Sequence, residues 1–137
     1  MIVLDTNVVS ELMRQFPDGK VAAWLDRQPQ SSIWTTSITL FEVRFGLQIM
    51  PVGRKRSALT MVFEGFLDKI NQRVVSFDVT AAHRAADLAA VRKSKGKPVE
   101  SRDTMIAGII LAHNATLATR NTSHFEEIST IINPWAA

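Results

Sequence analysis

The chain has 137 residues with 46% hydrophobic and 21% charged side chains, proportions that are typical of one folded domain and exclude an intrinsically disordered protein. Its 16 Lys and Arg against 13 Asp and Glu give a net charge of only +3, so the distribution of charge says more than the total. The absence of cysteine excludes disulfides, thiolate zinc sites and cysteine nucleophiles. No apolar run approaches the roughly 20 residues that span a bilayer. We expect one domain over residues 1–137, cytoplasmic, with no signal peptide and no membrane contact.

Short apolar runs alternate with segments of helical periodicity along the chain. The first run, Ile2 to Leu4, ends abruptly at Asp5, as expected of a buried parallel strand. Further strands are predicted at residues 32–35, 74–77, 115–119 and 130–132. Helices are predicted at residues 8–13, 21–25, 36–50, 57–70 and 81–93, and from 101 onward, followed by a helical turn over 123–127. Strands that alternate with helices indicate a single α/β/α sandwich with a central, mainly parallel sheet.

Polar residues at the predicted helix starts are expected to act as N-caps, because their side-chain oxygens can accept orphan backbone N–H groups. The predicted caps are Asn7, Thr39, Thr80 and Ser101. Thr39 and Glu42 also have the spacing of a capping box, which is a purely structural explanation for Glu42. In the helix over residues 57–70, the apolar side is expected to include Val62 and Phe63. Trp135 is expected to anchor the C-terminal tail by packing and not to be a site residue.

Three carboxylates are spaced so that they can meet at the carboxyl edge of the sheet, where open α/β folds bind their ligands. Asp5 ends the first strand, Glu42 lies in the helix after the second strand, and Asp103 lies in the first turn of the helix before the fourth. Charges this close to a core are costly unless they are paired or bound to metal, and none of the three has a dedicated basic partner in the local sequence. Capping and the helix dipole explain Glu42 and Asp103 separately, but not why all three lie at one edge.

Such a cluster favours Mg²⁺, or Mn²⁺ in its place, because hard cations prefer oxygen ligands and take further ligands from water and phosphate. A bound ion of this kind lowers the pKa of a water and neutralises charge during in-line attack on phosphorus, which needs no nucleophilic side chain. The three histidines have no metal-ligand spacing and are expected to be surface or packing residues. They are His83, His113 and His124.

Basic residues concentrate in two clusters. These are Arg54-Lys55-Arg56, and Arg92 with Lys93, Lys95 and Lys97. Both clusters could bind RNA by contacting its phosphates, and such binding would weaken with salt. Solvated helix ends are an equally good explanation for charge runs of this size.

Four short segments carry most of the polar residues discussed above. They are Ile2-Val3-Leu4-Asp5-Thr6-Asn7, Thr36-Ser37-Ile38-Thr39 leading to Glu42, Asp103-Thr104-Met105-Ile106-Ala107 and Ala118-Thr119-Arg120-Asn121. In this order and spacing they resemble the PIN-domain family, and within it the VapC-type and FitB-like toxins of bacterial toxin–antitoxin pairs. The resemblance extends over essentially the whole chain, including Lys97-Pro98-Val99 and the tail Asn133-Pro134-Trp135.

The resemblance implies a PIN-like fold and a Mg²⁺-dependent endoribonuclease that is the toxin of a type II toxin–antitoxin system, usually a homodimer. It also implies a DNA-binding antitoxin, encoded alongside, whose C-terminal segment covers the acidic site with an arginine that can compete with metal. Larger toxin–antitoxin assemblies on operator DNA are expected as well. By position, Asp5, Glu42 and Asp103 would be catalytic acids and metal ligands, Thr6 and Thr119 orienting hydroxyls, and Asn7 the residue that fixes the turn at Asp5.

One position departs from the family pattern. The fourth member of the acidic set is often aspartate, and here Asn121 takes its place. An amide can hydrogen-bond a metal-bound water but adds no charge, so Asn121 is included among the catalytic residues with a neutral role. We therefore predict one tightly held metal, with any second one dependent on substrate phosphate.

Other functions compete with this interpretation. Haloacid-dehalogenase-like phosphatases need a second aspartate two residues after the first, where this chain has Asn7. Response-regulator receivers need an acidic pair, and no acidic doublet accompanies Asp5. The alternative that stays open is a non-catalytic regulatory subunit that binds nucleic acid or an antitoxin through a degenerate PIN site, which Asn121 and the basic clusters favour.

Overall fold

The core of the protein is a five-stranded parallel sheet with strand order β3-β2-β1-β4-β5, in a computed structural model that describes residues 1–137. The strands are β1 (Ile2–Leu4), β2 (Ile33–Thr36), β3 (Val74–Val75), β4 (Thr116–Ala118) and β5 (Ile131–Ile132). The central strand β1 pairs with β2 through Ile2 and Ile33, and with β4 through Leu4 and Ala118. Because every pair is parallel, the carboxyl ends of the strands meet at one edge. The predicted α/β/α sandwich is confirmed.

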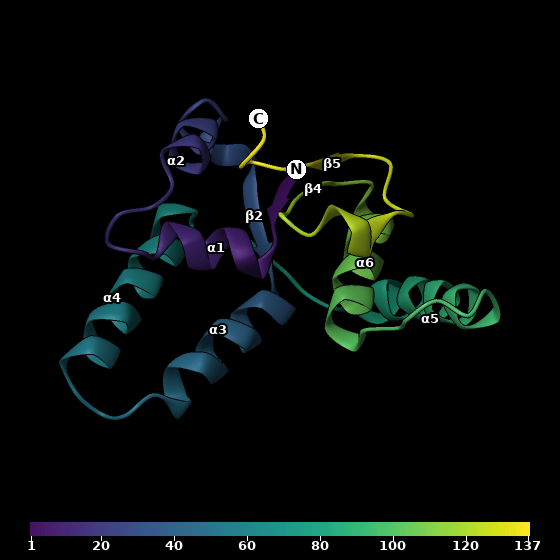
Figure 1. Cartoon of the computed structure of the whole chain (residues 1–137), viewed down its shortest axis with the longest axis horizontal. Coiled ribbons are helices and arrows are strands. Elements are labelled where there is room, and N and C mark those ends of the chain that lie inside the picture. The colour runs from purple at the N-terminus through teal and green to yellow at the C-terminus, as the bar shows by residue number, and fades with distance from the viewer.

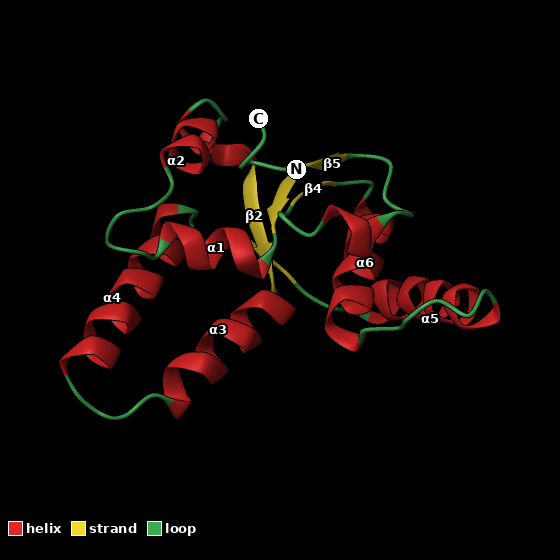
Figure 2. Ribbon diagram, in the orientation of Figure 1, coloured by secondary structure: helices red, strands yellow, loops and turns green.

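Helices cover both faces of the sheet (Figures 1 and 2). They are α1 (Thr6–Leu12), α2 (Gly19–Asp26), α3 (Ser37–Ile49), α4 (Arg54–Lys69), α5 (Val79–Ser94) and α6 (Ser101–His113), with 3-10 turns η1 (Gln30–Ser32) and η2 (Thr122–Phe125). In Figure 1, α1 to α4 lie on one side of the strands and α5 and α6 on the other. Successive strand residues point to opposite faces. Leu4 therefore packs in the core that contains Phe63 of α4, and Val3 in the core that contains Ile106 of α6.

The N-caps of four helices lie earlier in the sequence than predicted. The observed N-caps are Asp5 for α1, Thr36 for α3, Asp78 for α5 and Glu100 for α6, and each side chain accepts a backbone N–H of the first turn. The predicted caps Asn7, Thr39, Thr80 and Ser101 are wrong, because α1 and α3 turn into helix directly at the strand end and α5 and α6 use acidic caps. Since Thr36 is the cap of α3, Glu42 does not belong to a capping box.

Helix α6 approaches α5 so closely that there is no room for a side chain at Gly108. A Cβ at this position would lie 2.5 Å from the carbonyl oxygen of Ala81 and 2.7 Å from the Cβ of Ala85. The two helices can only pack in this way with glycine at the contact. This close contact fixes the direction of α6, whose first turn carries Asp103.

The outer surfaces of α3 and α4 are partly apolar. Helix α4 buries Phe63 in the core as predicted, but Val62 is 43% exposed, so its assignment to the apolar side is wrong. On α3, Phe41 and Phe45 are exposed and stack on each other with ring centroids 6.0 Å apart. None of the helices combines the length and the apolar character that crossing a bilayer would demand.

Candidate active site

Asp5 lies at the carboxyl end of the central strand and is buried, with 3% of its surface exposed. Its backbone N–H donates to the carbonyl oxygen of Ala118 (2.9 Å), which continues the pairing of β1 with β4 by one residue. Its side chain accepts two strong hydrogen bonds. The backbone N–H of Thr6 donates to Oδ1 (2.8 Å), and the hydroxyl of Thr119 donates to Oδ2 (2.7 Å). Asp5 is thus held between the first and fourth strands, as its position in the sequence predicts.

The pKa of Asp5 is raised from 3.8 to about 6. Burial is the main cause, because a carboxylate loses its hydration in the interior. The hydrogen bonds from Thr119 and Thr6 oppose this effect, whereas the negative charges of Asp103 and Glu42 add to it. A carboxyl group that is this costly to ionise and has two acidic neighbours is typical of a functional site.

Glu42 projects from α3 toward α1, where it is linked to Asp5 through Thr6. The Thr6 hydroxyl donates to Glu42 Oε1 (2.9 Å) and lies 3.0 Å from the hydroxyl of Thr39. The other carboxylate oxygen, Oε2, lies 3.7 Å from Nη1 of Arg102, in the first turn of α6. Glu42 therefore has a cationic partner that its local sequence does not reveal, because Arg102 is brought to it by the fold.

Asp103 also has a partner from a distant segment. Nδ1 of His124, in η2, lies 2.8 Å from Asp103 Oδ2. His124 is exposed, as expected of a surface residue, but nothing in the sequence indicated that it would contact a predicted catalytic acid. The available signal was its position three residues after Asn121, in the segment that follows β4. Glu100 also contacts Asp103, because its carboxylate accepts the backbone N–H of that residue (2.7 Å).

The segment that carries His124 is held by Arg92 of α5. The guanidinium donates through Nε and Nη2 to the two carboxylate oxygens of Glu127 (2.9 and 2.7 Å), and Nη2 also donates to the carbonyl oxygen of His124 (2.7 Å). These hydrogen bonds lower the pKa of Glu127 and raise that of Arg92. Arg92 is buried and fully engaged. It is therefore not a phosphate contact, and its inclusion in the basic cluster is corrected.

Two asparagines complete the polar network around Asp5. Nδ2 of Asn7 lies 3.3 Å from both Asp5 Oδ2 and the hydroxyl oxygen of Thr119, and its Oδ1 accepts the backbone N–H of Arg120 (3.2 Å). Asn7 therefore ties the turn after β1 to the turn after β4. Asn121 contributes its backbone N–H to the Thr119 hydroxyl (3.1 Å), while its side chain is exposed and makes no hydrogen bond.

The side chains around Asp5 have suitable chemistry for a metal ion, but they are not arranged as a complete set of ligands. The available side chains offer oxygen atoms, which hard cations prefer. A cation would also offset the burial of the Asp5 charge and its repulsion by Asp103 and Glu42, which together raise the pKa of Asp5. However, no three Asp, Glu, His or Cys side chains converge on one point in this arrangement. Glu42 and Asp103 are engaged with Arg102 and His124, so metal binding by all three acids requires both side chains to turn toward Asp5.

A model of the PIN domain matches residues 2–130 of the chain. The chain belongs to the PIN-domain family. It is 44% identical to "VapC ribonuclease Y4jK" from Sinorhizobium fredii, over 98% of both chains, and 35% identical to "Toxin FitB" from Neisseria gonorrhoeae, over 98% of this chain and 99% of the relative. A solved structure of FitAB bound to an IR36 DNA fragment superposes with a TM-score of 0.90 at 34% identity, covering 98% of this chain and 96% of that one. The predicted family and fold are confirmed.

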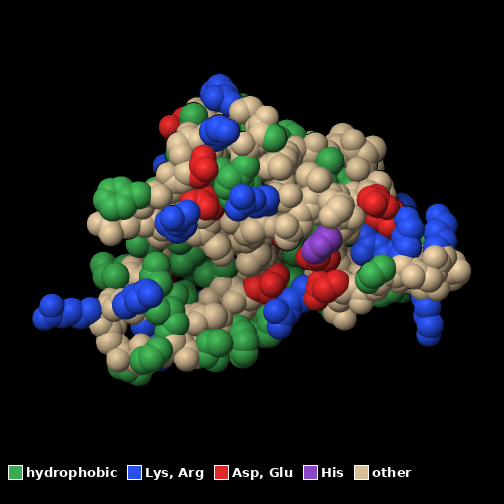
Figure 3. Space-filling view, in the orientation of Figure 1, with side chains coloured by type: hydrophobic (Ala, Val, Ile, Leu, Met, Phe, Trp, Pro, Cys, Tyr) green, Lys and Arg blue, Asp and Glu red, His purple; other side chains and the backbone are tan.

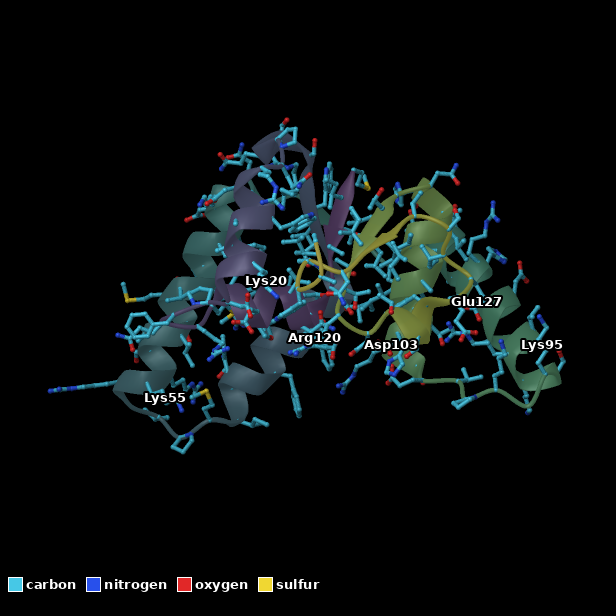
Figure 4. The ribbon with its side chains drawn as sticks, turned by 45° about the horizontal axis from the view of Figure 1, so that its top comes forward. Lys20, Lys55, Lys95, Asp103, Arg120 and Glu127 are labelled. Carbon is cyan, nitrogen blue, oxygen red and sulfur yellow. The ribbon has the colours of Figure 1, made fainter.

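The basic clusters lie on either side of the acidic centre of this PIN domain. Figure 3 shows acidic side chains and a histidine near the middle of one face, with many basic side chains projecting at its two ends. Figure 4 places Lys55 and Lys95 at opposite ends of the molecule, with Asp103 between them. Lys97 approaches the site, where it pairs with Glu126 (3.1 Å) and lines a polar pocket of about 340 Å³ beside Asp103. RNA binding stays a prediction for Arg54, Lys55, Arg56, Lys93, Lys95 and Lys97.

Proposed function

We propose that this protein is a metal-dependent endoribonuclease and the toxin of a type II toxin–antitoxin system. The observation that carries the proposal is the state of Asp5, a buried carboxylate whose pKa is raised by burial and by two further acids at the carboxyl edge of the sheet. Such a cluster of negative charge around a buried carboxylate destabilises the fold unless a cation binds to it. A role in binding a metal ion therefore explains it best. The relatives named VapC ribonuclease and Toxin FitB support the same activity.

Asp5, Glu42 and Asp103 would hold Mg²⁺, with Mn²⁺ as a substitute. The bound ion supplies an activated water and neutralises charge at the phosphate that is attacked. The protein positions the ligands: Thr119 and Asn7 hold the Asp5 carboxylate, and the Thr6 hydroxyl holds the Glu42 carboxylate. The exposed amide of Asn121 can hydrogen-bond a water without adding charge. With a neutral residue there, we expect one tight metal per chain, and a titration that finds two strong Mn²⁺ sites without RNA would contradict this.

The proposed partner is a DNA-binding antitoxin that covers the acidic site. The FitAB structure bound to DNA supports a partner of this kind and assembly on operator DNA. The exposed Phe41 and Phe45 also favour protein contacts, because burying their stacked aromatic rings under another chain removes apolar surface from water. A homodimer and localisation in the cytoplasm are further parts of this proposal.

RNA cleavage by the purified protein is the direct test. Incubation with total RNA and Mg²⁺ should give defined fragments, whereas EDTA or the variant Asp5→Asn should leave the RNA intact. Asp87→Asn, which makes the same carboxylate-to-amide change at an exposed position of α5, is the matched control and should cleave normally. Identical RNA patterns from the untreated, EDTA-treated and Asp5→Asn samples would exclude a metal-dependent nuclease. Growth arrest on expression, relieved by Asp103→Asn, tests the toxin role separately.

A non-catalytic regulatory subunit is the second candidate. It is favoured by the neutral Asn121 and by the absence of three acidic side chains that converge on one point. Such a subunit would bind RNA or the antitoxin equally well before and after the change Asp5→Asn, and would leave RNA intact under all conditions. A purified protein that cleaves RNA only with metal rules this candidate out.

A further inference from the structure

Arg120 is a cation at the rim of the acidic site that has no acidic partner. It follows Thr119 directly, and its backbone N–H donates to Oδ1 of Asn7, the same asparagine that lies beside Asp5. Its side chain is exposed, and none of the five ion pairs of the protein includes it. In the view of Figure 4, Arg120 and Asp103 are both labelled near the middle of the molecule. By contrast, Arg102 and Arg92 are both occupied by carboxylates.

The side chain of Arg120 is held by an aromatic ring from the end of the chain. Its guanidinium carbon lies 5.0 Å from the centroid of the Trp135 ring, a cation–π contact. Trp135 is itself fixed, because it packs against the core under α1 to α4 and its backbone N–H donates to Oδ1 of Asn133 (3.0 Å). The strand β5 brings this tail alongside β4. The backbone of Arg120 is therefore held by Asn7 and its guanidinium by Trp135, while the exposed side chain keeps its N–H donors open to solvent.

We propose that Arg120, positioned by Trp135, is a phosphate-binding site for the RNA strand next to the bond that is cleaved. This inference rests on the proposed ribonuclease function. An RNA strand that approaches Asp5, Glu42 and Asp103 meets negative charge, so a nearby cation must offset the repulsion on its phosphates. A guanidinium suits this task because its planar fork can donate two parallel hydrogen bonds to one phosphate. Stacking on an aromatic ring limits the side-chain freedom that is lost on binding.

Binding of RNA without cleavage tests the subsite directly. The probe is a fluorescently labelled single-stranded RNA, titrated in EDTA with full-length protein carrying Asp5→Asn. Adding Arg120→Ala should raise Kd about fivefold to tenfold, as expected for one charged contact. It should also reduce the slope of log K against log salt by about 0.7, the loss of one phosphate contact on a single strand. Arg27→Ala removes an exposed arginine that lies before β2, at the opposite edge of the sheet, and should change neither value.

Trp135 is tested as a positioning residue. Trp135→Leu should raise Kd about twofold to threefold, and Trp135→Phe should restore most of the binding because a ring is kept under the guanidinium. If Trp135 acts through Arg120, the double variant with Arg120→Ala binds no more weakly than Arg120→Ala alone. Thermal unfolding of each variant separates this effect from loss of the tail. Additive losses in the double variant would show that Trp135 does not act through Arg120.

The outcomes separate this inference from the proposed function. If the unmodified protein cleaves RNA but Arg120→Ala binds RNA with the affinity and salt slope of the Arg27→Ala control, the subsite is wrong and the nuclease stands. If the protein does not cleave RNA, the nuclease is wrong, and the binding data in EDTA still decide whether Arg120 contacts phosphates. A duplex DNA probe with an equal or larger dependence on Arg120 would overturn the assignment to RNA.

Discussion

Replacing Asp5 by asparagine should stabilise the fold at neutral pH while it abolishes RNA cleavage. The folded protein holds Asp5 with a pKa of about 6 instead of 3.8, so it binds this proton more tightly than the unfolded chain does. A pKa difference of about 2 corresponds to about 3 kcal/mol. This loss of folding stability is absent below pH 4, where Asp5 is protonated in both states, and it grows as the pH rises toward 6. Above pH 6 Asp5 is ionised in both states, and the folded protein is destabilised by the full amount.

Asparagine has nearly the same shape and is an equally good N-cap, so Asp5→Asn removes the charge and keeps the cap. Urea unfolding in EDTA should therefore show no gain for the variant near pH 4 and a gain of up to about 3 kcal/mol at pH 8, or roughly 10 °C in Tm. The exposed control Asp87→Asn should change stability by less than about 0.5 kcal/mol at both pH values. A variant that is no more stable than the parent at pH 8, or whose gain is the same at both pH values, would refute the reasoning.

Three further experiments test separate parts of the structure. Thr119→Val removes the strongest hydrogen bond to Asp5, so the Asp5 pKa should rise further and the acidic limb of the cleavage–pH profile should move to higher pH; an unmoved limb would contradict this. Gly108→Ala should cost about 1–3 kcal/mol in urea unfolding because α5 leaves no room for the methyl group, whereas Ala at the exposed, uncrowded Gly65 should stabilise by up to about 1 kcal/mol. Arg102→Ala frees Glu42 from a half-exposed ion pair and should tighten Mn²⁺ binding by calorimetry by up to about fivefold; weaker binding would mean that Arg102 does not compete with metal.

The sequence predicted the parts of the site that depend on strand ends. Asp5 could be assigned because an apolar run stops at a carboxylate, and the parallel sheet then required other strand ends to meet it there. The helix caps were misplaced by one to three residues, because several oxygen-bearing side chains stand near each helix start and any of them can accept an N–H. Only the backbone conformation decides which of them does.

The cations around the acids could not be predicted, for a different reason. Arg102 contacts Glu42 across 60 positions of sequence, and His124 contacts Asp103 across 21. Neither distance follows a helical or strand period, so no local pattern carries the pairing. These contacts exist because α6 starts at the sheet edge and because Arg92 holds the segment after β4 against it. Long-range ion pairs of this kind become visible only when the packing of the elements is known.

The hydrogen bond between Thr119 and Asp5 joins residues 114 positions apart and gives the site an order of assembly. During synthesis Asp5 leaves the ribosome 114 residues before Thr119, the residue that directly follows β4. Until then β1 lacks its neighbour on one side, and the carboxylate has neither its hydroxyl partner nor its burial. A nascent chain that lacks β4 and Thr119 therefore cannot form the site. A protein that attacks RNA would be harmless to the ribosome and message that produce it until this segment has been translated and has paired with β1.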